Sequence, residues 1–191
     1  MPTVSETMVC YGCGASVSMD DKVCPYCGKK LTFTSIRDVR GSTAQDSIKF
    51  LKTFKDALAN SPDHPGVQTS LGLVLFDRNQ FDQAAQAFDK AINCGADESE
   101  VFYYAAVARF RGKKPFQFSI NEAKHIVEMI DGAIMMNPLP QYFYAKSVVI
   151  KKLIEDKHMS YSTSSAQAQQ EAMDAHLTDA DIMDTNALLG I

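Results

Sequence analysis

The sequence predicts a mainly α-helical protein, an α-solenoid of helix pairs stacked in series, preceded by a small cysteine-rich segment. Two observations predict this class. Four of the five cysteines lie together near the N-terminus, and the rest of the chain repeats its apolar residues at helical spacing. Hydrophobic residues make up 46% of the 191 positions and charged residues 22%, which is the balance expected of a globular protein with a packed core.

The net charge of −4 gives no overall attraction to nucleic acid or to an anionic membrane, so such a contact would need a local patch. The first residues lack the charged start and the apolar stretch of a secretory signal, and the longest apolar run, residues 101–108, is too short to span a bilayer. We therefore expect a cytoplasmic protein without a membrane segment. In a reducing compartment, clustered cysteines indicate metal ligation rather than disulfides.

The cysteines form two Cys-x-x-Cys pairs, Cys10 with Cys13 and Cys24 with Cys27, and glycine follows each pair. Two such pairs supply the thiolates of a tetrahedral zinc site, because each pair wraps one tight turn around the ion. The glycine can take positive φ, which lets backbone N–H groups face the sulfurs. The sequence thus predicts one structural Zn²⁺. Because four thiolates close the site, we expect no hydrolytic water on the ion.

The cysteine pattern resembles the zinc-ribbon domain found at the N-terminus of many bacterial proteins, which reads close to C-x-x-C-G and then C-P-x-C-G. The resemblance continues through Gly28, Lys29, Lys30 and Leu31, and it implies a small β zinc ribbon over residues 1–33. Cys24-Pro-Tyr-Cys27 is also the redox motif of glutaredoxins. There, however, the dithiol sits between a strand and a long helix, whereas a second cysteine pair lies upstream here.

Residues 34–43 show no apolar period and predict a linker. A helix should begin near residue 43, because Ser42 with Gln45, or Thr43 with Asp46, has the spacing of a helix N-cap. The apolar pattern that follows predicts a helix to about residue 60.

The remainder of the chain repeats itself. Four positions recur after 34 residues, as Phe50, Phe54, Ala57 and Pro62 are followed by Ala84, Phe88, Ala91 and Ala96. The position of Ala91 recurs 42 residues later at Ala133 and 42 later again at Ala175, and this count predicts the Leu-Gly pair found at 189 and 190. Two repeats therefore carry eight extra residues each, which we place near 112–119 and 156–164. Such a series predicts stacked helix pairs.

This spacing resembles the tetratricopeptide (TPR) pattern, in which Leu-Gly in the first helix of a pair precedes Ala, a large apolar residue and Ala in the second. The resemblance covers residues 44–191. It is good around Leu71-Gly72, where we expect Gly72 to let the first helix approach Ala84, and weaker where Ala105-Ala106 and Ser147-Val148 replace Leu-Gly. Sel1-like repeats are the close alternative, and both imply an α-solenoid.

In TPR-like families one face of the first helices forms a concave surface that binds partners. The resemblance therefore implies a surface for an apolar helix or peptide of another protein. Carried over by register, its residues are Leu73, Phe76, Tyr103, Val107, Phe110, Arg111, Tyr142, Val149 and Lys152. One alternative stays open, in which the acidic segment after Lys157 folds back and fills this surface.

No phosphate loop, catalytic triad, paired-carboxylate motif or open metal site appears in the sequence, so we expect no enzyme. The first hypothesis is a protein-interaction adaptor. The second is a nucleic-acid-associated regulator that uses the ribbon and the basic and aromatic residues of segment 109–118, namely Arg109, Arg111, Lys113, Lys114, Phe116 and Phe118. A redox enzyme would require Cys24 and Cys27 to cycle with glutathione. A homo-oligomer is compatible with the sequence.

Overall fold

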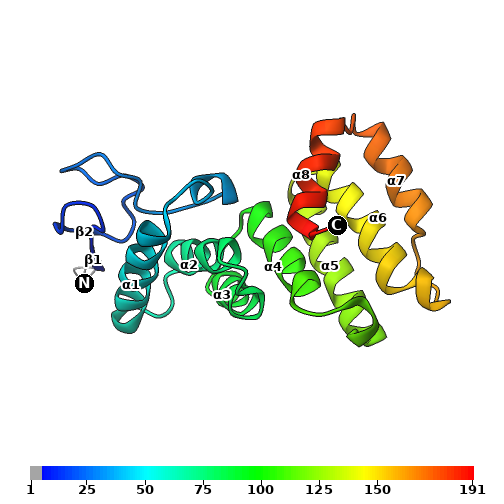
Figure 1. Cartoon of the computed structure of the whole chain (residues 1–191), viewed down its shortest axis with the longest axis horizontal. Helices are drawn as coiled ribbons and strands as arrows, with labels where there is room; N and C mark the ends of the chain where they lie inside the picture. Colours follow the sequence, from blue (N-terminus) through cyan, green and yellow to red (C-terminus); the bar gives the residue numbers. More distant parts are fainter. Residues whose placement is uncertain (1–5) are drawn as a thin grey trace. The chain divides into compact units, whose positions relative to one another are not determined.

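Eight α-helices and one two-stranded antiparallel sheet make up residues 6–191, the part of the chain that the computed structural model describes (Figure 1). The chain divides into two units, unit 1 up to Asp97 and unit 2 from Glu98. The prediction of a mainly helical chain with a small β segment at its start is confirmed. Residues 1–5, which we assigned to the beginning of the ribbon, lie outside the described residues.

The small sheet opens unit 1. Strand β1 (Thr7–Val9) pairs with β2 (Ser16–Ser18), with Met8 opposite Val17. Met8 and Val17 are buried while Thr7 and Val9 are exposed, because successive side chains of a strand point to opposite faces. The buried face packs on helix α1 (Ala44–Asn60).

The segment that we predicted as a linker is packed into unit 1. It contains a short 3₁₀ helix, η1 (Ile36–Asp38), and its apolar residues Ile36 and Val39 are buried. Phe33, the residue just before the segment, is also buried, and Ser70 of α2 (Pro65–Asp77) fixes it, because the Ser70 Oγ accepts a hydrogen bond from the Phe33 N–H at 2.8 Å. Ile36 and Val39 are three residues apart, which is the period of a 3₁₀ turn.

Helix α1 begins where the sequence predicts, and it uses Thr43 with Asp46 as its cap. Thr43 Oγ1 accepts from the Asp46 N–H at 3.1 Å, and the Asp46 carboxylate accepts from the Thr43 N–H at 3.2 Å. This reciprocal pair satisfies two N–H groups that a helix start leaves free. Further along, the rings of Phe50 and Phe54 pack edge-on against Phe33, with ring centroids 5.0 and 5.6 Å away.

Helices α2 and α3 (Phe81–Asn93) form the first helix pair. A Cβ at Gly72 would lie only 2.6 Å from the ring of Phe88, which is fully buried. The ring of Phe88 therefore fills the space that the missing side chain of Gly72 leaves. The approach of the first helix to Ala84, which we expected from the TPR pattern, stays a prediction.

Five helices make up unit 2: α4 (Ser99–Gly112), α5 (Ile120–Met136), α6 (Pro140–Leu153), α7 (Ser165–Asp174) and α8 (Asp179–Leu189). Consecutive helices from α4 to α7 pack against each other, whereas α8 packs on α6 and α4. The two long connections, 113–119 and 154–164, contain the 3₁₀ helices η2 (Pro115–Gln117) and η3 (Glu155–Lys157). They lie where the repeat count places the extra residues.

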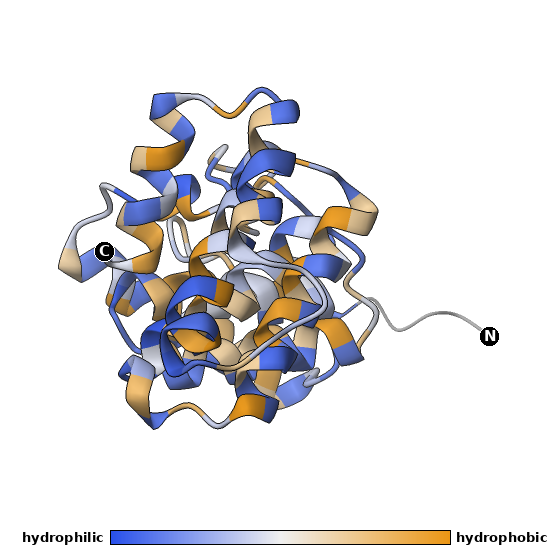
Figure 2. Cartoon of the chain, turned by 90° about the vertical axis from the view of Figure 1, so that its right-hand side faces the viewer, coloured by the Kyte–Doolittle hydropathy of each residue, from blue (hydrophilic) through white to orange (hydrophobic). Residues whose placement is uncertain are grey.

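Hydrophobic and hydrophilic residues alternate along the helices in Figure 2, as expected for helices that each bury one face. The core helices α2 and α4 are buried over most of their length, with nine buried residues each. Within residues 6–191, none of the helices combines the length and apolar character that crossing a bilayer would require.

Replacing Gly72 by Ala tests the packing of the first helix pair. The added methyl group must displace the buried Phe88 ring, so we expect unit 1 to lose about 1–3 kcal/mol of unfolding free energy despite the better helix propensity of Ala. Urea unfolding with a probe in each unit measures this loss. Gly132→Ala in α5 is the matched control, because its Cβ would lie 3.5 Å from Phe102 in ordinary contact. The packing is contradicted if both variants are equally stable or stabilised.

Candidate metal centre and helix-covered surface

The four cysteines of the ribbon meet at one point. Their sulfurs all lie within 4.8 Å of one another, and the Sγ–Sγ distance is 3.7 Å both for Cys10 with Cys27 and for Cys13 with Cys24. A regular tetrahedron with metal–sulfur bonds of about 2.3 Å has edges of about 3.8 Å. The residues therefore fit a single tetrahedrally bound metal ion.

Each cysteine pair forms the same tight turn. The Gly14 N–H donates to the Cys10 carbonyl and the Gly28 N–H to the Cys24 carbonyl, both at 2.9 Å. Both glycines have positive φ, +77° and +73°, as we expected from the sequence. In the first turn the Gly12 N–H also points at the Cys10 sulfur, 3.4 Å away. Such N–H groups spread the negative charge of metal-bound thiolates.

The cluster is half-buried and is anchored to helix α1. Cys10 and Cys24 are buried, whereas Cys13 and Cys27 are exposed. Tyr11 links the cluster to the helix, because its ring packs edge-on against Phe50 with centroids 4.6 Å apart. Its hydroxyl donates to the Lys30 carbonyl at 2.7 Å, which ties the second turn to the first.

A metal ion held here would act as a cross-link between the two turns. All four ligands are thiols, and thiolates are soft donors that suit zinc or iron–sulfur chemistry better than magnesium or calcium. Because four protein ligands fill a tetrahedral ion, a substrate would have no free coordination position. The arrangement is that of a structural site.

The predicted partner-binding residues are mostly buried in this structure. Leu73 and Phe76 lie in the core of unit 1, where Phe76 packs edge-on against Phe81. In unit 2, Arg111 and Lys152 are partly exposed, and the buried members of the set are Tyr103, Val107, Phe110, Tyr142 and Val149. They do not form an open surface in the described conformation, and binding of a partner by these residues stays a prediction.

The structure does bring the α4 and α6 members of the set together. The rings of Tyr103 and Tyr142 lie with centroids 4.6 Å apart, and the Tyr142 hydroxyl is 3.2 Å from Ser99 Oγ. Burial raises the pKa of Tyr142 to about 12 and raises the pKa of Tyr103 further above its usual value. Both hydroxyls therefore stay protonated at neutral pH.

Helix α8 covers this α4–α6 surface, and the two helices lie beside it in Figure 1. Its buried residues are Thr185, Leu188 and Leu189. Thr185 lies beside the Tyr103 hydroxyl and partly offsets the rise in the Tyr103 pKa that burial causes. Tyr144 of α6 donates to the side-chain oxygen of Asn186 at 3.1 Å. Helix α8 belongs to the acidic segment after Lys157. Within unit 2 it therefore folds back onto α4 and α6, as in the alternative that the sequence left open.

Arg111 holds the C-terminal end of α8. Its guanidinium donates to the carbonyl of Leu188 at 2.9 Å and to that of Ala187 at 3.4 Å. The last carbonyls of a helix lack partners within the helix and carry partial negative charge. A cation at this point therefore recognises a helix end through its backbone, whatever its side chains are.

The basic and aromatic segment 109–118 is largely engaged inside unit 2. Lys113 pairs with Glu122, and this hydrogen bond together with two from Ser119 lowers the pKa of Glu122 to about 2. Phe118 is buried, and its carbonyl accepts a hydrogen bond from Lys157 at 2.6 Å. Phe116 is the exposed aromatic residue of the segment.

Metal analysis of the purified chain tests the cysteine cluster. We expect one equivalent of metal per chain, and we expect Cys10→Ser with Cys24→Ser to lose it, because two of the four thiolates are gone. Elemental analysis by mass spectrometry measures the content. Cys94→Ser is the matched control and should keep the metal, since Cys94 lies outside the cluster. A double variant that retains a full equivalent would refute the site.

No known protein-family model matches the sequence, and no curated protein matches it. Its function is therefore inferred from its own residues and geometry. Two features matter most: a closed cluster of four thiols in unit 1, and a surface of α4 and α6 that holds a helix in unit 2.

Proposed function

We propose that this chain is a non-catalytic protein-interaction adaptor of the cytoplasm. In this proposal an N-terminal zinc ribbon is structural, and TPR-like helix pairs bind an apolar helix of a partner protein. The observation that carries the proposal is the seat of α8 on α4 and α6, because a surface that holds one helix has the shape and chemistry to hold another.

Zinc is the metal that the cysteine cluster supports best. Two Cys-x-x-Cys turns with sulfurs at tetrahedral spacing are the donor set of structural zinc sites. The two strands that precede and follow the first turn have three residues each, too few to stabilise a ribbon alone. Binding of zinc to small peptides of this kind contributes about 10–16 kcal/mol. The bound ion would therefore keep the ribbon folded on α1.

The contacts of α8 define the helix that the surface accepts. Its apolar anchor is the pair Leu188 and Leu189, one turn after Thr185, and these face α4 and α6. The backbone end of the helix meets Arg111. A partner helix would need the same features. These are two adjacent apolar residues, a small residue three and four positions before them, and a C-terminal end placed at Arg111.

Such a partner must displace α8, and α8 is lightly held. Only three of its eleven residues are buried, compared with nine of the fourteen residues in α4. This small buried share lowers the cost of exchanging α8 for another helix.

Binding of an α8 peptide in trans tests this function. In the full chain, Leu188→Asp with Leu189→Asp should vacate the surface, because two buried leucines become charged. If α8 covers the surface in nine tenths of wild-type molecules, a labelled peptide of residues 178–191 should bind the vacated chain about tenfold more tightly. Fluorescence anisotropy measures the affinity, and adding Arg111→Ala should weaken it.

The matched control carries Ala180→Asp and Met183→Asp, which add the same charge at two exposed positions of α8. It should bind the peptide as weakly as the wild type does. Circular dichroism reports whether the vacated chain keeps its helices. The proposal fails if the vacated chain gains no affinity over this control, or if unit 2 loses its helices when α8 is released.

A further inference from the structure

Strand β1 pairs with β2 along one edge only. The Cys10 N–H donates to the Ala15 carbonyl at 2.8 Å, and the Met19 N–H donates to the Glu6 carbonyl at 2.9 Å. Backbone groups alternate in direction along an antiparallel strand, so those of Thr7 and Val9 point to the other edge. Within residues 6–191, no strand pairs with that edge. It therefore offers free donors and acceptors to an added strand.

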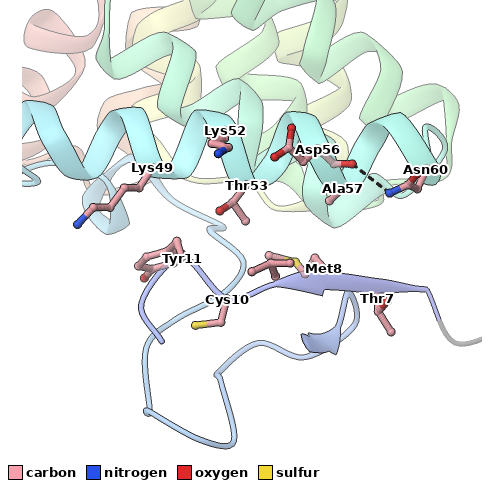
Figure 3. Close-up of a pocket in the computed structure, with 11 residues that line it drawn as sticks. Thr7, Met8, Cys10, Tyr11, Lys49, Lys52, Thr53, Asp56, Ala57 and Asn60 are labelled. Atoms are coloured by element: carbon pink, nitrogen blue, oxygen red, sulfur yellow. Dashed lines mark hydrogen bonds between the residues drawn. The ribbon is translucent and has the colours of Figure 1, made fainter. Parts of the chain in front are cut away.

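A cavity of about 320 Å³ lies between this strand and helix α1 (Figure 3). Residues 7–11 form one wall, and one face of α1 forms the other, with Lys49, Lys52, Thr53, Asp56, Ala57 and Asn60. Figure 3 shows Thr53 and Ala57 directed from α1 toward Met8. The buried side chains of Met8 and Ala57 make the middle of the cavity apolar.

The two ends of the cavity differ in charge. Lys49 lies at the Tyr11 end in Figure 3, while Asn60 lies at the Thr7 end. Lys49 and Lys52 are both exposed. Asn60 is neutral, and its side-chain N–H donates to the Asp56 carbonyl at 3.4 Å. The Asp56 carboxylate also lines the cavity, on the part of α1 between Lys52 and Asn60. An acidic group on the ligand is therefore favoured at the end with the two lysines.

We infer that the groove between β1 and α1 binds an extended acidic peptide of a partner protein by strand addition. Its backbone pairs with Thr7 and Val9, as in other recognition by an added strand. A small apolar side chain fills the cavity beside Met8, and a carboxylate two residues away on the same face meets Lys49 and Lys52.

A five-residue probe tests this site in the metal-loaded full chain. The peptide acetyl-Glu-Thr-Val-Thr-Glu-amide places Val centrally and a Glu at either end, so both strand directions bring a carboxylate to the lysines. We expect shifts in the NMR amide signals of Thr7 and Val9 and slower exchange of these two amides. Replacing Lys49 and Lys52 by Gln should weaken binding about fivefold at low salt, from two exposed ion pairs.

The matched control carries Lys55→Gln and Lys90→Gln, which remove the same charge outside the cavity and should bind as the wild type does. Val9→Pro deletes an N–H on the free edge and should abolish binding, while the β1–β2 signals stay in place. Two variants of the peptide, one N-methylated at Val and the other at both Thr, test the backbone pairing. The N–H of Val and those of the two Thr point to opposite edges of an added strand, so strand addition requires that only one variant binds.

Three outcomes would overturn the inference. The first is an absence of shifts at Thr7 and Val9 at millimolar peptide. The second is equal binding of both N-methylated peptides. The third is a shift at these amides that follows the protein concentration without peptide, which would assign the edge to a second copy of the chain. None of these results bears on the α8 surface, which the peptide of residues 178–191 tests separately in unit 2.

Discussion

Unit 2 depends on one constraint, which is that the apolar face shared by α4 and α6 must be covered. Tyr103 and Tyr142 on this face are almost completely buried, and burial of large, mostly apolar side chains is what favours covering such a face. Helix α8 covers this face with two leucines, and Arg111 donates hydrogen bonds to the last carbonyls of the helix. The surface that binds α8 is therefore built by α4 and α6, and Arg111 contacts only the backbone of the helix end. For this reason we propose that another helix can bind to it.

The cysteine-rich segment of unit 1 has too few residues to be stabilised by a hydrophobic core of its own. Four thiols at tetrahedral spacing would hold its two turns together around a bound ion, and Tyr11 joins the first turn to Phe50 of α1. The sheet packs on α1 by one face, and among residues 6–191 no second strand pairs with β1, so one edge of β1 lies unpaired beside the lysines of α1. We propose that a partner strand uses these backbone groups.

Local signals in the sequence predicted the elements well, because caps and cysteine turns are decided by neighbouring residues. Thr43 with Asp46 starts α1 as expected, and the glycines after the cysteine pairs have positive φ. Tertiary choices were harder to predict. Periodicity predicts a helix near Leu189-Gly190, but it does not predict that this helix packs on α4 and α6. The contact of the Phe88 ring with Gly72 depends on how α2 and α3 pack, which the sequence pattern does not specify. The free edge of β1 had no sequence signal, since it follows from pairing on one side.

The central claim is that α8 is a detachable cover on a surface that the rest of unit 2 builds. Native-state hydrogen exchange of the wild-type chain measures this directly, because local opening and global unfolding are separated by their free energies. The account predicts that the amides of α8 exchange through an opening at least about 2 kcal/mol easier than that of α4 and α6. Equal opening free energies for α8, α4 and α6 would show that α8 is an inseparable part of the core and would contradict the account.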